Sequence, residues 1–343
     1  MSLNIQADPT SKTPLYKQLL AQFEDAIHGG VLAAGEQLSS MNDLSAQTGI
    51  SKETVKKAYR ILAEKGLIVP KQGKGFYVAD NNPDAKLSVL VLFDKFSVYK
   101  QTLFNSLAET LGDKAELTIL THNQSLELLE YYLDNYLDRF DYYVITPHFP
   151  LDEASQVRAA RLISRIPNRK LVMLDRLLPG YAGNYAAVYQ DFENDIYYGL
   201  TQGLDRFQPS SRLKVITMPT SLYGSLIRKG IDRFSAEYGI PVEYLTEQPT
   251  LLSRGDTFLI LNSQLDSGLV GLARQIKAQN LTIGRDVRII SYNEFDLYEI
   301  VLGGLTTISA DFRQMGRLAG EMILDKKPAK IHCNFHMTRR STF

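Results

Sequence analysis

The stretch that decides the fold is residues 40–78, SMNDLSAQTGISKETVKKAYRILAEKGLIVPKQGKGFYV. Ser40 and Asp43 have the spacing of a capping box, in which the serine hydroxyl accepts from a backbone N–H three residues on and the acid reaches back. Gly49 predicts the end of this first helix, because glycine adopts the left-handed turn without steric cost. Ser51 caps a second helix, which ends at Gly66. The apolar positions of the second helix recur at spacings of three and four, at Val55, Ala58, Tyr59 and Leu62.

A basic hairpin follows the second helix. Two short β-prone runs, Leu67–Val69 and Phe76–Val78, are joined by a loop with glycines and lysines. Residues 51–75 hold seven lysines and arginines against two glutamates, a local charge of +5, whereas the whole chain is neutral with 38 residues of each sign. Clustered positive charge is typical of a phosphate-binding surface, although a solvated helix face is the alternative explanation. Helix, turn, basic helix and basic wing together predict a winged helix-turn-helix that reads double-stranded DNA.

The start of the second helix is the part we expect to face DNA. Recognition helices present their amino-terminal residues to base edges and phosphates, and a wing reaches the backbone or the minor groove. An earlier helix, opened by Pro14, is expected to pack behind them through an apolar stripe that runs from Leu15 to Ile27. The residues expected at the DNA are Ser51, Lys52, Glu53, Thr54 and Lys56 on the helix, and Gln72, Gly73 and Lys74 at the wing tip.

Motifs before and within this stretch resemble the GntR family of bacterial transcription regulators. They are Thr13–Leu19, Ile27–Leu38, Ser51–Val55, Gly66-Leu67 and Gly73–Gly75, and the resemblance covers about residues 12 to 78. The resemblance implies further DNA contacts at Ser40 and Asn42. The family usually has Leu-Pro-Ser where this chain has Leu38-Ser39-Ser40, and an arginine where it has Asn42, so the usual operator preference need not carry over.

The composition limits the class of protein to which the rest of the chain can belong. The 343 residues are 44% hydrophobic, which is enough for a sizeable core, and Cys333 is the only cysteine, so no disulfide can form within the chain. We expect a cytoplasmic protein with no membrane segment, because neither a signal peptide nor an apolar run of 18 residues is recognisable. The polar, turn-prone residues 80–86 are the expected linker. They would separate a DNA-binding domain at 1–79 from an effector domain at 87–343.

Beyond the linker, short apolar runs alternate with amphipathic stretches. This alternation predicts parallel βαβ units, an α/β class with two doubly wound lobes, a change of lobe near residues 187–191 and a cleft between the lobes. The expected strands are 88–93, 117–121, 142–146, 170–174, 213–217, 257–261 and 287–291. The expected helices are 99–111, 125–137, 153–166, 192–207, 223–238, 264–278 and 312–324.

Polar residues follow most of these strands. In open α/β sheets, ligands bind beyond the carboxyl ends of the strands. A mixture of carboxylates, amides, arginine and aromatic rings suits a neutral polyol, although loops are polar in any case. The residues expected at an effector are Asp94, Tyr99, His148, Asp175, Arg176, Asp191, Arg228, Asn262, Asn293 and Glu294.

This set is similar to the effector domain of LacI-type sugar repressors, which itself resembles periplasmic sugar-binding proteins. The similarity covers about residues 87 to 343 and includes strands that end in Asp175-Arg176, Asn262 and Asn293-Glu294. It implies that Asp175, Asn262 and Asn293 line a sugar site. The family's usual cleft arginine is Ile227 here, with Arg228 beside it, so either Arg228 takes that role or the ligand is recognised differently.

Other groups of residues give weaker evidence of a function. His332 and His336 would lie on one face of a single strand, with Cys333 on the other, but they lack a third ligand, so neither a metal nor a cofactor is expected. No Ser/His/Asp or Cys/His arrangement indicates an enzyme. We therefore expect a homodimeric transcription regulator, a repressor relieved by a monosaccharide such as a pentose or deoxyhexose. A regulator with a purine or amino acid effector, and an enzyme with a DNA tether, are the alternatives.

Overall fold

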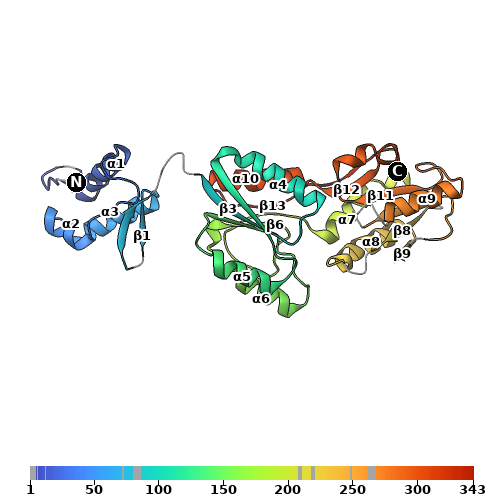
Figure 1. Cartoon of the computed structure of the whole chain (residues 1–343), viewed down its shortest axis with the longest axis horizontal. Helices are drawn as coiled ribbons and strands as arrows, with labels where there is room; N and C mark the ends of the chain where they lie inside the picture. Colours follow the sequence, from blue (N-terminus) through green and yellow to red (C-terminus); the bar gives the residue numbers. More distant parts are fainter. Residues whose placement is uncertain are drawn as a thin grey trace. The chain divides into compact units, whose positions relative to one another are not determined.

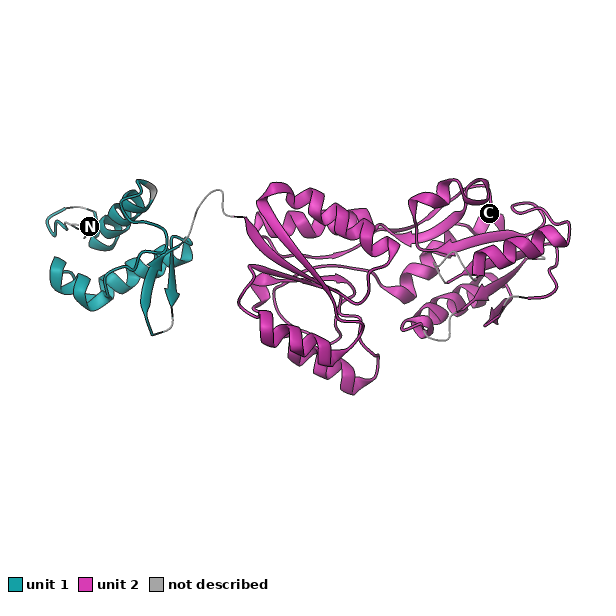
Figure 2. Ribbon diagram, viewed as in Figure 1, with its two compact units in different colours: residues 1–85 teal, residues 86–343 magenta. Residues whose placement is uncertain are grey.

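The chain divides into two compact units, Met1–Ala85 and Lys86–Phe343, which are coloured separately in Figure 2. The computed structural model describes residues 5, 7–11, 13–71, 73–79, 86–207, 211–217, 221–247, 249–261 and 268–343. Two of the expected site residues, Gln72 and Asn262, lie outside the described residues, and so do residues 80–85 of the expected linker.

The first unit consists of three helices and a hairpin (Figure 1). Ser40 begins α2 as expected, because its hydroxyl oxygen accepts from Asp43 N at 3.1 Å. The return contact differs from a standard capping box, since the Ser40 hydroxyl donates to the Asp43 carboxylate at 2.7 Å. Gly49 ends α2 with a φ of 71°, and Ser51 caps α3. The elements are α1 (Leu15–His28), α2 (Met41–Thr48), α3 (Lys52–Glu64), β1 (Ile68–Lys71) and β2 (Gly75–Val78).

A small apolar core fixes the orientation of α3. Leu19 and Phe23 of α1 are buried in one cluster with Val55 and Tyr59 of α3. The Tyr59 hydroxyl donates to the carbonyl of Ser39 at 2.8 Å and ties α3 to the residues before α2. The spacing of three and four therefore buries one side of α3 and leaves its lysine-bearing side in solvent.

The first lobe of the second unit is a six-stranded parallel sheet with the order β13-β7-β6-β5-β3-β4. Alternate residues of β3 serve two cores: Val89 and Val91 face α4 and α10, and Leu90 and Leu92 face α5 and α6 (Figure 1). The strands are β3 (Leu87–Phe93), β4 (Ala115–Thr121), β5 (Tyr142–Ile145), β6 (Leu171–Asp175), β7 (Ala186–Tyr189) and β13 (Lys330–His332). The helices are α4 (Val98–Leu111), α5 (Leu126–Tyr136), α6 (Glu153–Ile163) and α10 (Phe312–Asp325).

The second lobe repeats this plan with the strand order β14-β12-β11-β10-β8-β9, in which only β14 runs antiparallel. The strands are β8 (Arg212–Ile216), β9 (Val242–Leu245), β10 (Asp256–Ile260), β11 (Arg288–Tyr292), β12 (Thr306–Ala310) and β14 (Phe335–Thr338). The helices are α7 (Phe192–Thr201), α8 (Gly224–Tyr238) and α9 (Val270–Ala278). The expected α/β class and the seven expected strands are confirmed to within two residues at each end.

The chain passes between the lobes three times, after Tyr189, after Ala310 and after His332. The first passage comes where the change of lobe was expected. The third passage was not expected, and the prediction of one strand across residues 331–337 is wrong. Lys330–His332 pairs with β7 in the first lobe, whereas Phe335–Thr338 pairs with β12 in the second. The alternation of apolar residues continues across the break because each half buries its own apolar side.

Close packing of α10 on α4 depends on a glycine. A Cβ added at Gly316 would lie 2.3 Å from the carbonyl oxygen of Leu103 and 2.9 Å from Leu107 N, which are backbone atoms that cannot rotate away. We expect Gly316→Ala to lower the free energy of unfolding of the second unit by about 1–3 kcal/mol, as overpacking does. Gly224→Ala is the control, since its Cβ would meet nothing closer than 3.6 Å. Equal urea midpoints for the two variants would contradict this account of the helix pair.

Candidate functional site

The amino-terminal end of α3 carries an exposed group of polar and basic side chains. Ser51 Oγ accepts from Thr54 N at 3.3 Å and lies 2.8 Å from Thr54 Oγ1, so both hydroxyls are engaged in capping the helix. Lys52 and Lys56 extend into solvent, and Lys56 lies 3.8 Å from the Glu53 carboxylate. Such an exposed pair is worth little in water and is easily exchanged for a phosphate.

The other expected DNA residues are also at the surface of the first unit. Ser40 and Asn42 are exposed at the start of α2, and Gly73 and Lys74 are exposed at the tip of the hairpin. Gly73 has a φ of 72°, a conformation that favours glycine, and Gln37 Nε2 donates to the Lys74 carbonyl at 2.7 Å. The wing tip is therefore shaped by its backbone and leaves the Lys74 side chain outside.

A second candidate site lies at the carboxyl ends of the first-lobe strands, where Lys100 joins two aspartates. Its Nζ lies 2.5 Å from Asp175 Oδ2 and 3.4 Å from Asp94 Oδ1. All three side chains are at most 3% exposed. Asp94 directly follows β3, Asp175 ends β6, and α4 begins four residues after Asp94 and carries Lys100 in its first turn. The sequence analysis did not select Lys100.

Each member of this group holds the others in the charged form. Burial favours the neutral carboxylic acid of Asp175, but the Lys100 ammonium and His148 outweigh it and hold the pKa of that carboxyl far below its usual range. Burial also favours the neutral form of Asp94, but Lys100 and His148 outweigh it and lower the pKa of that carboxyl. Burial disfavours the Lys100 ammonium, but Asp175 and Asp94 raise its pKa above the usual range.

Further polar side chains surround the ion pairs. His148 Nε2 lies 3.1 Å from Asp175 Oδ2, at ion-pair distance but not in hydrogen-bond alignment. Thr146 Oγ1 donates to Asp94 at 3.2 Å, and Gln190 Nε2 donates to Asp175 Oδ1. His122 lies 3.0 Å from the Thr146 carbonyl oxygen, and its burial lowers the pKa of that imidazole to about 4. The network thus runs from the ends of β3, β4 and β5 to the first passage between the lobes.

Tyr223 brings the second lobe to this network. Its ring stacks on Phe192 at 4.2 Å, stands edge-on to His148 at 5.0 Å, and lies 5.3 Å from the Arg176 guanidinium. Arg176 is also buried and donates to Gln156 Oε1 at 3.1 Å. Tyr223 is therefore the contact through which the polar ends of the two lobes meet, and the sequence analysis did not select it either.

Several buried polar atoms at the strand ends of the two lobes have no hydrogen-bond partner among the described residues. In the network they are His148 Nε2, Gln190 Oε1 and Tyr223 OH; the others are Ser97 Oγ just before α4, and Tyr292 OH and Asn293 Oδ1 at the end of β11. Leaving a buried polar group unpaired costs about 1–3 kcal/mol, so such a cluster indicates a place for a ligand. Asn293, like Asp175, has a φ of 72°, and the two residues follow or end the third strand of their sheets, β11 and β6. The strand ends of the two lobes are thus built alike.

The structure does not bring all expected residues into this group. Arg228 is 60% exposed on α8, where it lies 3.6 Å from Asp232 and over the ring of Tyr244, so Arg176 and not Arg228 is the arginine beside Asp175. Asp191 accepts from Asn194 N at 3.2 Å and caps α7. Glu294 accepts from Arg340 at 2.9 Å and from Thr307 at 2.5 Å, inside the second lobe.

Tyr99 lies near the group without joining its ion pairs. Its ring packs on Phe312 at 5.0 Å, where α4 and α10 begin. Burial raises the pKa of Tyr292 well above its usual range, with smaller contributions from Asp195, Asp175 and Tyr99.

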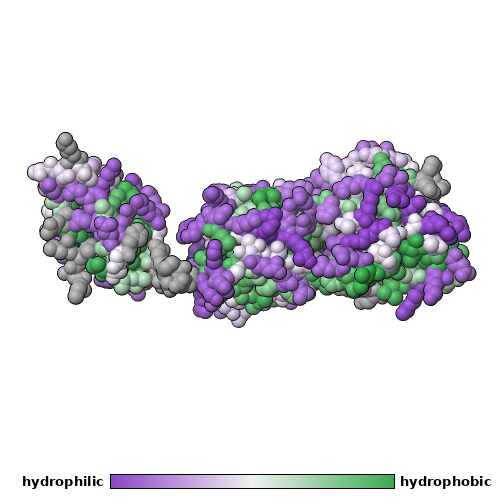
Figure 3. Space-filling model, turned by 90° about the horizontal axis from the view of Figure 1, so that it is seen from above, coloured by the Kyte–Doolittle hydropathy of each residue, from purple (hydrophilic) through white to green (hydrophobic). Residues whose placement is uncertain are grey.

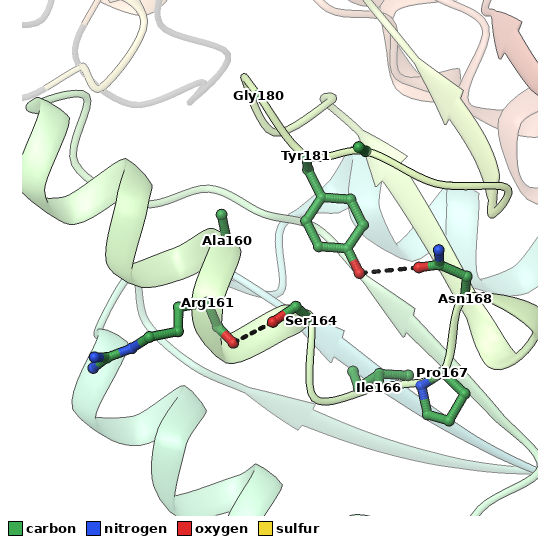
Figure 4. Close-up of a pocket in the computed structure, with 9 residues that line it drawn as sticks. Ala160, Arg161, Ser164, Ile166, Pro167, Asn168, Gly180 and Tyr181 are labelled. Carbon is green, nitrogen blue, oxygen red and sulfur yellow. Dashed lines mark hydrogen bonds between the residues drawn. The ribbon is translucent and has the colours of Figure 1, made fainter.

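A separate hollow of about 480 Å³ lies on the first lobe (Figure 4). It lies at the amino end of β6, opposite to Asp175, and is lined by Ala160, Arg161, Ser164, Ile166, Pro167, Asn168, Gly180, Tyr181 and Ala182. Its polar groups bind one another: Tyr181 OH donates to Asn168 Oδ1 at 3.2 Å, and Ser164 Oγ donates to the Arg161 carbonyl at 2.7 Å. This hollow has none of the unpaired buried atoms that mark the other group.

Two further observations concern the described part of the chain. No group of three or more His, Cys, Asp or Glu side chains there could hold a metal ion, and His332 lies 2.8 Å from Asp195 instead of near His336. No helix there is long and apolar enough to cross a bilayer. On the face shown in Figure 3, hydrophilic and hydrophobic side chains are interspersed over both units.

Both units of the chain are similar to known protein families. Residues 15–78 match the family of bacterial regulatory proteins called gntR, and residues 227–342 match the periplasmic binding protein-like domain. Over 77 residues, 22% of this chain and 59% of the relative, the chain is 35% identical to the HTH-type transcriptional repressor YtrA of Bacillus subtilis. Over 113 residues, 33% of this chain and 41% of the relative, it is 36% identical to the regulator TreR of that species. The chain thus spans about half the length of these curated relatives.

Solved structures resemble the second unit. The dimeric Lac repressor with an 11-residue C-terminal deletion has a TM-score of 0.59 and 17% identity, over 75% of this chain and 98% of that chain. The trehalose repressor of Escherichia coli has a TM-score of 0.59 and 12% identity, over 74% of this chain and all of that chain. At these identities the likeness concerns the fold. The chain therefore joins a gntR-type helix-turn-helix domain to a unit with the fold of LacI-like, periplasmic-binding-protein-like domains.

The ion pairs predict how stability depends on pH. In the wild type, the lowered pKa values of Asp94 and Asp175 give a stabilisation that is present above about pH 4, the unfolded pKa of aspartate, and is lost as pH falls further. Lys100→Met leaves two buried carboxylates without their ammonium, and we expect it to cost about 3–5 kcal/mol at pH 7.

The cost of Lys100→Met should shrink at pH 5, because the unpaired carboxyls of the variant take up protons as the pH falls. Urea unfolding of the second unit at the two pH values measures it. Lys95→Met, which removes an exposed lysine five residues earlier, is the control. A penalty for Lys100→Met that is equal at both pH values would contradict the proposed charge network.

Proposed function

We propose that this chain, which joins a gntR-type DNA-binding domain to a periplasmic-binding-protein-like unit, is a transcription regulator that responds to a small molecule. One observation carries the proposal. The chain couples an exposed basic helix in the first unit to unpaired buried polar atoms at the facing strand ends of the second. The first feature supports binding to double-stranded operator DNA, and the second supports an effector site.

We further propose that the regulator is a homodimeric repressor released by a monosaccharide. Two solved structures of similar fold support this proposal, because both are connected with sugars. One is the trehalose repressor of Escherichia coli, and the other is a periplasmic binding protein/LacI transcriptional regulator of Alkaliphilus metalliredigens complexed with D-xylulofuranose. The latter has a TM-score of 0.55 and 14% identity, over 75% of this chain and 99% of that chain. The Lac repressor neighbour is dimeric, and a twofold dimer suits paired half-sites on DNA.

The contacts suggest how an effector would act on the lobes. Asp175 binds Gln190 at the first passage between them, and Tyr223 of the second lobe lies against His148 and Arg176 of the first. A ligand that pairs with Gln190, Tyr223 and Asn293 would favour one arrangement of the lobes over another. To move a two-state equilibrium from 1:99 to 99:1, that preference must reach about 5.5 kcal/mol.

A purine or amino acid remains the second candidate for the effector. Phe192 and Tyr223 already stack on each other, so at least one face of each ring is covered and unavailable to a purine. An amino acid would need fixed partners for an ammonium and a carboxylate, whereas Asp94, Asp175 and Lys100 already pair with one another. Both observations favour a sugar over these alternatives, and nothing in the site indicates a catalytic group.

The unpaired hydroxyl of Tyr223 provides the test of the effector site. A thermal-shift screen of monosaccharides, purines and amino acids identifies the ligand, which at 100 times its Kd should add about 2.7 kcal/mol to the stability of the second unit. We expect Tyr223→Phe to leave the stability of the ligand-free protein unchanged or higher, and to weaken ligand binding by about three- to tenfold.

Tyr143→Phe is the matched control for Tyr223→Phe. Its hydroxyl donates to the Tyr136 carbonyl at 2.8 Å inside the first-lobe core, so its loss should lower stability without changing ligand affinity. The assignment of the effector site fails if Tyr223→Phe binds the ligand as tightly as the wild type does.

The basic residues of α3 provide the test of DNA binding. We expect the double substitution of Lys52 and Lys56 by alanine to weaken binding to operator DNA and to reduce the slope of log K against log salt by about two, since each phosphate contact contributes about 0.9. Lys65→Ala is the control, because Lys65 lies beyond the other end of the helix and pairs with Glu24 at 2.5 Å. An unchanged slope in the double variant would remove both lysines from the interface.

A further inference from the structure

We call the proposed ligand site, where Tyr223 of the second lobe meets His148 and Arg176 of the first, the effector cleft. Its charged side chains already have partners within the protein. Asp94 and Asp175 share Lys100. Arg176 donates to Gln156 and lies over the ring of Tyr223. The carboxylates of Asp94 and Asp175, the Lys100 ammonium and the Arg176 guanidinium sum to zero charge, and His148 beside the two aspartates adds a positive charge only when it is protonated. With His148 neutral, a ligand meets a polar but electrically balanced wall.

Apart from the His148 imidazole, whose Nε2 has no aligned hydrogen bond, the atoms that lack a partner belong to uncharged groups. Among the described residues of the cleft they are the amide oxygens of Gln190 and Asn293 and the hydroxyls of Tyr223 and Tyr292, with that of Ser97 close by. The first four side chains are each at most 9% exposed. Burial raises the pKa of both tyrosines above their usual range, so their hydroxyls stay protonated. The open positions comprise two acceptors and two groups that both donate and accept.

This pattern of donors and acceptors selects among ligands. A ligand hydroxyl can donate to Gln190 and Asn293 and can also exchange hydrogen bonds with Tyr223 and Tyr292. A phosphate or carboxylate only accepts, so it would leave the amide oxygens unpaired. An ammonium only donates, and it would lie near Lys100, whose charge already compensates the aspartates. Burying either ion without a counter-charge is costly.

We propose that Lys100 is a specificity-determining residue, which balances Asp94 and Asp175 and thereby makes the cleft select an uncharged polyhydroxyl ligand over its charged analogues. This inference rests on the proposed function, because it concerns the same effector site. Lys100 acts through the two aspartates and need not touch the ligand. Without Lys100 the cleft would carry a net negative charge and a space where an ammonium fits.

The first experiment uses the wild-type full chain and matched sugars. Thermal melting is recorded with galactose, glucose, fucose, arabinose, xylose and ribose, and with galactosamine, glucosamine, galacturonate, glucuronate, glucose 6-phosphate and ribose 5-phosphate. We expect at least one neutral sugar to raise the melting temperature. Every charged compound should bind with an apparent affinity at least tenfold lower than that of this sugar. A charged compound that binds as tightly as the best neutral sugar overturns the inference but leaves an effector-binding regulator standing. Silence from all neutral sugars overturns both the inference and the sugar effector.

The second experiment changes the charge of the cleft. Lys100→Ala removes the side chain beyond Cβ, and n-propylammonium has the same three carbons and nitrogen as the missing part. We expect n-propylammonium, but not n-propanol, to raise the melting temperature of Lys100→Ala and to restore its binding of the neutral sugar. Wild type and Lys95→Ala should show neither effect. Lys100→Ala should also bind an amino sugar at least tenfold more tightly than wild type does.

A charge-balanced double variant keeps the inference testable if Lys100→Ala does not fold. Lys100→Met/Asp94→Asn removes one charge of each sign, so Asp175 is again offset by Arg176. We expect this variant to retain the preference for neutral sugars. A Lys100→Ala variant that binds the neutral sugar with wild-type affinity, ignores n-propylammonium and still rejects the amino sugar would show that Lys100 does not determine specificity. A double variant that binds the amino sugar as tightly as the neutral sugar would show the same.

Discussion

The second unit is organised around a buried ammonium. Lys100 loses its hydration beside the end of β3, and the nearby carboxylates of Asp94 and Asp175 compensate for that loss. Three structural elements must therefore meet correctly: β3, β6 and the first turns of α4. Asp175 in turn binds Gln190, where the chain first leaves the lobe. The proposed effector site and the first passage thus share one polar network, so a ligand bound there would also affect the connection between the lobes.

Much of the fold follows from local rules that the sequence displays. The serine caps and Gly49 bound the helices of the first unit, and short apolar runs mark the inner strands of both sheets. Short edge strands such as β9 and β13 are not visible in this way, because their burial depends on neighbours far along the chain. The break between β13 and β14 is hidden for the same reason, since alternation continues across it while the pairing partner changes.

The candidate site was predictable where it lies at strand ends. Asp94, Asp175 and Asn293 follow or end buried runs, and the carboxyl ends of parallel strands meet at one edge. Lys100 was not predictable in this way, because it lies inside helix α4 and not at the end of a strand, and only the tertiary structure buries it. Arg228 shows the converse: its neighbour Ile227 is in the core, and one step around the helix turns the arginine outward.

The central claim is that occupancy of the effector cleft controls binding of the first unit to DNA. The most direct measurement is the fluorescence anisotropy of a labelled operator fragment, enriched from genomic DNA by the protein itself, titrated with the full chain in the presence and absence of a saturating sugar. The account predicts that the sugar changes the apparent Kd for the operator at least tenfold. It also predicts that Tyr223→Phe needs more sugar for the same effect. An operator affinity that is identical with and without a sugar bound in the cleft would contradict the account.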